Sequence, residues 1–385
     1  MLAPATHVTP IAGQPGRSTY DGGAHAGDGS PVELSRHRGD EHVNLLMSRP
    51  GLAAAETLPG TWLYGGLLRP HFGLLLRECL GRLWAWQDHG PFDGLVFLPH
   101  GADPQPGYAA ALREMRALQQ VLRLLGIAVP LRVPTRPTRF ERLVVPEQLL
   151  FEPEPAKTAQ AARLRAMFRS LASGPVALDG LKLTQAYVSR ARLGPAYGRF
   201  LLERVLEENF ARAGYAIIQP ERLPLATQVA AYRGARRIVF MESSAIHLGA
   251  PIIPDECEVG VIWRGREPHP PMRRFLRGCG VAHLSEFWGI QGFIRSLPPG
   301  APPDAASRPV AFNPRYALTV PDFDRLGRQL IKSGFLPAEA WRNPEPTEVA
   351  AAIEQGLAAK RSLAPGRSHA YVALLPGRSR RPAER

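Results

Sequence analysis

Lysine and cysteine are scarce in this chain of 385 residues. Lysine occurs at only four positions, so arginine carries almost all of the positive charge. The three cysteines, Cys79, Cys257 and Cys279, lie far apart and fit neither a disulfide framework nor a zinc-binding spacing. We therefore interpret them as small structural residues.

Long apolar runs are also missing. No stretch reaches the roughly 20 consecutive apolar residues of a membrane-spanning helix. The N-terminal residues are polar and rich in glycine and proline, unlike a secretory signal segment. Hydrophobic residues still make up 45% of the chain, which excludes a wholly disordered protein. Together these features predict a cytoplasmic, soluble protein.

Two kinds of functional motif are absent. Neither the GxxxxGK[ST] phosphate loop nor a GxGxxG fingerprint between a strand and a helix is present. No paired-histidine or aspartate-rich constellation suggests a metal centre. The sequence therefore predicts no metal and no resident cofactor.

The net charge of +13 permits nucleic acid, an anionic membrane or anionic substrates as partners. Residues 360–385 hold seven basic side chains and one acidic one, so this segment carries much of the excess. A solvated basic tail is the simplest interpretation, and peripheral contact with an anionic membrane would add about 1 kcal/mol per basic residue. Nucleic-acid binding ranks last, because it requires the basic side chains to cluster on the folded body.

The first half of the chain divides into a predicted leader and a predicted domain. Residues 1–50 are polar and rich in glycine and proline, which predicts a flexible leader. Residues 51–175 are expected to form an α/β domain with a helical segment that starts at Leu67 and is broken near Pro70, a strand at GLVFLPH and a helix over 105–126. Residues 140–151 look extended, but Pro146 argues against a central strand.

The second half shows a clear alternation of strands and helices. Over 176–300 the expected order is KLTQAYVS, RFLLERVLEENFARAG, YAIIQ, LATQVAAYRGA, RRIVFM, SSAIHLGA and EVGVIW. Such a βαβαβ pattern predicts a parallel sheet covered by helices. Residues 301–385 are expected to form a loop, two packing helices near 322–333 and 346–359, and the basic tail.

Polar residues follow two of these strands. The first N–H groups of a helix can hold a phosphate, so Ser243 and Ser244 are either a structural cap or an anion site. His247 would line the same rim, and Glu242 would either favour the helix dipole or contact a sugar hydroxyl.

Two arginines are candidates for binding an anion. Arg190 ends a predicted strand, where its planar guanidinium could bind a phosphate. Arg199 is predicted to begin a helix, where the dipole disfavours a cation unless an anion lies nearby. The alternative for both is an ion pair, with Glu203 one turn beyond Arg199.

At these residues the sequence resembles glycosyltransferase family 61. The likeness runs from about 60 to 265. The segments that carry it are His71-Phe72-Gly73 through Glu78 and Arg82-Leu83, Tyr187-Val188-Ser189-Arg190, Arg199 with Glu203, Gly214-Tyr215, Leu223-Pro224-Leu225 with Gln228, Ala235–Val239, and Ser244-Ala245-Ile246-His247.

The resemblance implies two Rossmann-like domains in a GT-B arrangement. It also implies metal-independent, inverting transfer from a nucleotide sugar to a glycan acceptor, as in capsular polysaccharide synthesis. On this hypothesis Arg190, Arg199, Glu242 and the Ser243-Ser244 turn bind the donor, with His247 in the same pocket.

Glu78 and His71 are the candidate bases for the acceptor hydroxyl. Relatives usually carry histidine where this chain has Leu74, and glycine where it has Ser243. The alternative function is therefore a non-catalytic relative that keeps a sugar-nucleotide pocket or acts as a scaffold.

Overall fold

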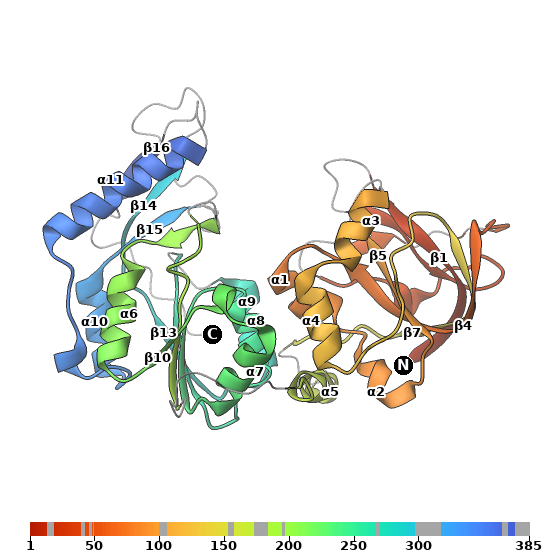
Figure 1. The fold of residues 1–385 in the computed structure, drawn as a ribbon, viewed down its shortest axis with the longest axis horizontal. Coiled ribbons are helices and arrows are strands. Elements are labelled where there is room, and N and C mark those ends of the chain that lie inside the picture. Colours follow the sequence, from red (N-terminus) through yellow and green to blue (C-terminus); the bar gives the residue numbers. More distant parts are fainter. Residues whose placement is uncertain are drawn as a thin grey trace.

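Two lobes make up the protein, and each is built around its own β-sheet (Figure 1). The computed structural model describes residues 1–13, 19–39, 43–45, 48, 50–99, 106–152, 158–172, 184–194, 197–265, 269–296, 317–363 and 369–373. Within these residues no helix is long and apolar enough to cross a membrane.

A mixed seven-stranded sheet forms the first lobe, in the order β3-β2-β1-β7-β4-β5-β6. Its strands are β1 (Leu2–Gly13), β2 (Thr19–His25), β3 (Val43–Leu45), β4 (Glu56–Leu68), β5 (Gly94–Pro99), β6 (Leu131–Arg132) and β7 (Thr138–Pro146). Strands β7, β4, β5 and β6 run parallel, whereas β1 is antiparallel to both of its neighbours.

The prediction of a flexible leader over 1–50 is wrong for the segments that form β1 and β2. Strand β1 pairs with β7 from Leu2 opposite Pro146 to Val8 opposite Thr138. A ladder of backbone hydrogen bonds to a distant strand holds this segment, and Val8 is fully buried beneath it. Composition describes only local preference, so it does not reveal such a partner.

One further expectation about this lobe is wrong. Strand β7 is central, between β1 and β4, because Pro146 lies at its last residue and interrupts little of the ladder. The break expected at Pro70 is confirmed, because β4 continues to Leu68 and the helical segment begins at Phe72.

The helical elements of this lobe are short. They are α1 (Phe72–Leu74), the π-helical turn η2 (Leu75–Cys79), α2 (Trp84–His89), α3 (Pro106–Arg113), α4 (Arg116–Leu124) and α5 (Thr158–Arg169). The single helix expected over 105–126 is thus divided into α3 and α4. The predicted strand at GLVFLPH is confirmed as β5, whose residues are all buried.

An all-parallel sheet in the order β10-β8-β11-β12-β13 forms the second lobe and confirms the predicted alternation. Its strands are β8 (Gln185–Val188), β10 (Ala216–Ile218), β11 (Arg237–Met241), β12 (Glu258–Ile262) and β13 (His283–Phe287). Helices α6 (Glu203–Arg212), α7 (Leu225–Gly234), α8 (Ala245–Gly249) and α9 (Pro270–Gly278) connect them. The strand order reverses between β8 and β11, and open sheets of this kind bind ligands beyond such a reversal.

A third sheet, in the order β16-β14-β15-β9, extends the second lobe and is not predicted by the local pattern. It contains β9 (Arg199–Phe200), β14 (Ile290–Ser296), β15 (Leu318–Pro321) and β16 (His369–Ala373). The predicted packing helices are confirmed as α10 (Phe323–Lys332) and α11 (Pro346–Leu363). Arg199 therefore lies in a strand and does not begin a helix, because β9 pairs with β15.

The two lobes meet along α5 and the loop before β12. Arg165 and Arg169 of α5 both form ion pairs with Asp255, at 2.7 and 2.8 Å. Arg233 of α7 donates to the carbonyl oxygens of Arg169 and Leu171 at 2.7 Å. The fold is thus mixed α/β with parallel strands in both lobes, and the GT-B arrangement stays a prediction.

The predicted boundary at 175/176 and the tail residues 374–385 lie outside the described residues.

Candidate functional site

Polar residues gather where the order of the five-stranded sheet reverses. Ser189 and Arg190 directly follow β8, and Glu242 directly follows β11, its neighbour in the sheet. Arg264 stands two residues beyond the end of β12, the next strand. The carboxyl ends of three adjacent parallel strands thus bring two arginines and a carboxylate to one edge.

Glu203, on the first turn of α6, is hydrogen-bonded to the residues at the end of β8 that form part of this edge. Its Oε1 accepts hydrogen bonds from the Tyr187 hydroxyl at 3.1 Å, the Ser189 hydroxyl at 3.2 Å and the Arg190 backbone N–H at 2.6 Å. Burial raises the pKa of Glu203 to about 7, although these donors oppose the shift. Glu203 therefore holds the backbone that carries Arg190, and it is not the exposed ion-pair partner that the sequence suggested for Arg199.

Arg190 itself is held at one end only. Its Nη2 donates to the carbonyl oxygens of Tyr197 and Gly198 at 3.0 and 3.3 Å, whereas its buried Nε has no hydrogen-bond partner among the described atoms. Burial, with the neighbouring charge of Arg264, lowers the pKa of Arg190 to about 10. A half-buried guanidinium with a spare donor is a suitable group for an anionic ligand.

Arg264 completes this edge and was missed from the sequence. Its backbone N–H donates to Oε2 of Glu242 at 2.8 Å, and its Nε donates to the Glu242 carbonyl oxygen at 3.0 Å. Arg199 lies close by, with Nη2 donating to the Ala191 carbonyl oxygen at 3.2 Å. The pattern that identified Arg190, an arginine just after a strand, also describes Arg264 and would have found it.

The serine turn after β11 differs from a simple helix cap. Ser244 has helical dihedral angles, φ −63° and ψ −15°, and its side chain makes no capping hydrogen bond. The hydroxyl of Ser243 instead accepts from the Ala245 backbone N–H at 3.3 Å. Only Ser243 therefore has a local structural role.

His247 of α8 is buried without hydrogen bonds to either ring nitrogen from the described residues. Its ring meets Phe275 of α9 edge-on, with the centroids 4.8 Å apart. Burial lowers the pKa of His247 to about 3, and the charge of Arg77 lowers it further. The imidazole is therefore neutral at ordinary pH and lies near the cationic Arg77 of the other lobe.

Gly73 of α1 lies at the contact between the first lobe and α8 of the second lobe. A Cβ on Gly73 would lie 2.8 Å from both Nδ1 of His247 and Oγ of Ser244. Only glycine allows α1 and α8 to come so close. His71 precedes this contact and caps α1, since its Nδ1 accepts from the Leu74 backbone N–H at 3.2 Å.

Glu78 of η2 also lies on the side of the first lobe that meets the second lobe, and it is buried beside arginine side chains. Its carboxylate forms ion pairs with Arg77 and, at 3.6 Å, with Arg69. It also lies 3.7 Å from Nε2 of His37, whose pKa is lowered by burial. Burial alone would raise the pKa of Glu78, but His37 and Arg77 outweigh burial and lower it to about 2. Glu78 is thus an anion that is already surrounded by positive charge.

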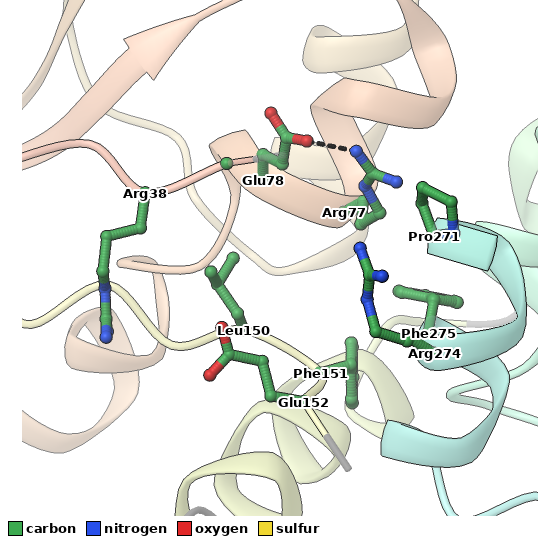
Figure 2. Close-up of a pocket in the computed structure, with 10 residues that line it drawn as sticks. Arg38, Arg77, Glu78, Leu150, Phe151, Glu152, Pro271, Arg274 and Phe275 are labelled. Carbon is green, nitrogen blue, oxygen red and sulfur yellow. Dashed lines mark hydrogen bonds and ion pairs between the residues drawn. The ribbon is translucent and has the colours of Figure 1, made fainter. Parts of the chain in front are cut away.

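A cavity of about 290 Å³ opens beside Glu78 between the two lobes (Figure 2). Residues of the first lobe and of α9 line it: Arg38, Gly39, Arg77, Glu78, Leu150, Phe151, Glu152, Pro271, Arg274 and Phe275. In Figure 2 the Arg274 side chain extends from α9 toward Arg77 on the opposite lobe. Glu78 is one of the predicted site residues, whereas the sequence pattern did not single out these arginines.

The structure thus gathers the predicted residues in two groups. His71 and Glu78 of the first lobe lie with Ser244 and His247 of the second at the contact between the lobes. Arg190, Arg199, Glu242 and Ser243 lie along the edge of the five-stranded sheet. Within the described ranges no cluster of three or more histidine, cysteine or acidic side chains is arranged to hold a metal ion.

Glu203 gives the site a testable pH dependence. Because its folded-state pKa is raised from 4.5 to about 7, its contribution to stability is fully present below about pH 4.5 and is lost as pH rises through 7. We expect the stability advantage of the wild type over Glu203→Gln to shrink between about pH 5 and pH 8, as measured by urea unfolding. A constant difference would contradict the raised pKa.

The sequence matches the model of a known protein family. The model of the family described as Glycosyltransferase 61 matches residues 56–252, from the start of β4 to just beyond α8. No curated protein matches the sequence. The family match covers just over half of the chain and includes every predicted site residue. The chain therefore belongs to glycosyltransferase family 61, which supports glycosyltransferase activity with a nucleotide-sugar donor and an acceptor.

Proposed function

We propose that this protein transfers a sugar from a nucleotide-sugar donor to a glycan acceptor, with inversion at the anomeric carbon and without a metal ion. The family supports the general activity. The observation that carries the proposal is the edge of the five-stranded sheet, where Arg190 and Arg264 flank Glu242 at the reversal of strand order. This is the position at which open parallel sheets bind nucleotides.

The donor diphosphate would lie against Arg190, Arg199 and the Ser243-Ser244 turn. As the sugar departs, negative charge develops on the diphosphate, and fixed cationic side chains stabilise that charge without reorganising. Glu242 would accept a hydrogen bond from a sugar hydroxyl. His247, which is neutral and has ring nitrogens without described partners, would contact the donor from the side nearest the first lobe.

Glu78 is the better of the two candidate bases. Nδ1 of His71 already accepts the Leu74 N–H, so that nitrogen is not available to take a proton from the acceptor hydroxyl. Oε2 of Glu78 accepts no hydrogen bond from the described part of the chain. A pKa of about 2 makes Glu78 a weak base in this arrangement, so efficient proton removal requires weaker contacts with the neighbouring arginines.

The cellular role follows from the same hypothesis. Transfer onto a growing surface or capsular polysaccharide would take place in the cytoplasm, at the inner face of the membrane. The basic segment 360–385 would then attract the protein to anionic lipids.

Loss of Arg190 tests the donor site. We expect Arg190→Ala to weaken binding of a nucleoside diphosphate at least about tenfold, because charge-assisted hydrogen bonds are lost. The measurement is thermal stability with UDP, GDP, CMP or dTDP, and ATP as a control. A ligand at 100 times its dissociation constant should stabilise the wild type by about 2.7 kcal/mol.

Arg192→Ala is the matched control, since Arg192 is exposed two residues further on. Unchanged nucleotide affinity in Arg190→Ala would remove this arginine from the site. If every nucleotide leaves the wild type unaffected, the non-catalytic alternative becomes the better one, in keeping with Leu74 at the position where relatives usually carry histidine. Salt-sensitive binding of DNA or RNA that survives deletion of 360–385 would favour the nucleic-acid alternative.

A further inference from the structure

The cavity between η2 and α9 holds more positive than negative side chains. Arg38, Arg77 and Arg274 line it, against Glu78 and Glu152. We propose that this cavity is the acceptor subsite and that it selects an acceptor with an anionic group, a carboxylate or a phosphate, held by Arg38 and Arg274 together with Arg77. This inference rests on the glycosyltransferase function proposed above and adds the chemical class of the acceptor.

The negative charge of Glu78 is already balanced within the protein. Arg77 and Arg69 both form ion pairs with its carboxylate, and His37 lies 3.7 Å away. Glu78 therefore adds little repulsion toward an incoming anion. Arg38, which also lies 3.9 Å from Glu147, and Arg274 line the cavity with Glu152, so the lining as a whole holds more positive than negative side chains.

Arg38 has hydrogen-bond donors to offer. Its Nη2 donates to the Gln148 carbonyl oxygen at 2.6 Å and lies 3.9 Å from the carboxylate of Glu147. Its Nε and Nη1 make no hydrogen bond to any residue that the structure describes, and the side chain is 40% exposed. A guanidinium fixed at one nitrogen and open at the others is well placed for a carboxylate or phosphate.

Apolar side chains complete a site that suits a sugar. Leu150, Phe151 and Phe275 line the cavity, and the two aromatic rings meet edge-on with centroids 5.2 Å apart. Small-molecule sites typically combine such apolar walls with a few polar groups that fix orientation. The cavity volume of about 290 Å³ lies near the lower end of the range for ligand pockets.

The position of the cavity separates it from the donor. None of its lining residues comes from the edge of the five-stranded sheet that carries Arg190 and Glu242. Phe275 nevertheless contacts His247 on one side and lines the cavity on the other, so an occupant would lie one aromatic ring away from the donor side. An anion here is therefore a part of the acceptor and is distinct from the donor diphosphate.

Binding of such an anion would also prepare the base. A carboxylate or phosphate beside Arg77 competes with Glu78 for the same guanidinium. When Arg77 balances less of the negative charge of Glu78, the Glu78 carboxylate binds a proton more tightly. The correct acceptor therefore makes Glu78 a stronger base.

The test compares three small sugars as probes of the full-length protein. These are methyl β-D-glucuronide, its neutral counterpart methyl β-D-glucoside, and glucose 6-phosphate, with binding measured by ligand-observed NMR. We expect at least one anionic sugar to bind about tenfold more tightly than the glucoside. The stronger of the two anionic probes identifies whether the group is a carboxylate or a phosphate.

Arg274→Gln and Arg38→Gln are expected to reduce the affinity for the anionic sugar to that for the glucoside. Arg277→Gln is the matched control, because Arg277 is exposed on α9 and does not line the cavity. Equal affinities for charged and neutral sugars, or an equal loss in all three variants, would overturn the inference.

Binding of nucleoside diphosphates is measured on the same samples and separates the two proposals. A nucleotide that binds equally well to the wild type and Arg274→Gln supports the donor site, even if the anionic sugar shows no preference. An anionic sugar that binds without any nucleotide doing so would leave the anion site in place and contradict the transferase.

Discussion

Changing Glu78 to glutamine is expected to lower the free energy of unfolding by about 3–5 kcal/mol, the usual cost of removing one partner from a buried ion pair. The glutamine keeps the shape of the side chain but removes the charge that Arg77 and Arg69 share. These two half-buried guanidinium groups would then lose the carboxylate that lies between them. Because Glu78 is also the proposed base, glycosyl transfer should fall in the same variant.

The pH dependence of this loss identifies its cause. The folded-state pKa of Glu78 is lowered to about 2, so its stabilising contribution is present above about pH 4.5 and is lost as pH falls toward 2. The difference between wild type and Glu78→Gln in urea unfolding should therefore shrink in acid.

Glu33→Gln is the control for this experiment, since Glu33 pairs with Arg36 at 3.0 Å but is 68% exposed. Its loss should cost about 1 kcal/mol or less. Equal effects at Glu33 and Glu78 would contradict the buried-charge explanation.

Adding one methyl group at Gly73 is expected to disturb the contact between the lobes. The new Cβ would lie 2.8 Å from Nδ1 of His247 and from Oγ of Ser244, and 3.1 Å from Cβ of Ser244. Overpacking of this kind costs about 1–3 kcal/mol. A shift in the position of α1 against α8 would also misplace His71 and Glu78, so transfer should fall more steeply than stability.

Gly107→Ala is the matched control, because nothing lies within 4 Å of its added Cβ. That exposed helix position should tolerate alanine or gain up to about 1 kcal/mol. The double variant Gly73→Ala with Ser244→Gly removes one of the two collisions and should recover part of the lost stability. Strictly additive effects would show that α1 and α8 do not meet as described.

Local sequence patterns predicted the second lobe well and the first lobe poorly. From β8 to β12 each strand and its helix are neighbours in the chain, so hydrophobic periodicity identifies them. Strands β1 and β9 are held by partners far away in the sequence, β7 and β15. Their own residues show no strong local preference, so the prediction gave a leader for one and the start of a helix for the other.

The residues of the site were predictable only where they follow a buried strand. Arg190 and Glu242 were recognised because they follow buried strands, a feature that a single sequence displays. The cavity arginines were missed because Arg274 lies on the exposed face of a helix and becomes significant only when α9 meets η2. A contact between two lobes cannot be inferred from the pattern of either one alone.

The pairing of β9 with β15 determines how late in synthesis the donor side of the site can fold. Strand β9 leaves the ribosome soon after β8, but its partner β15 follows only when both larger sheets have been synthesised. Domains generally fold as units during translation, starting from the N-terminus. The segment that carries Arg199 can therefore form its strand pairing only after β15 has been synthesised. A nascent chain would gain its complete donor pocket only close to the end of synthesis.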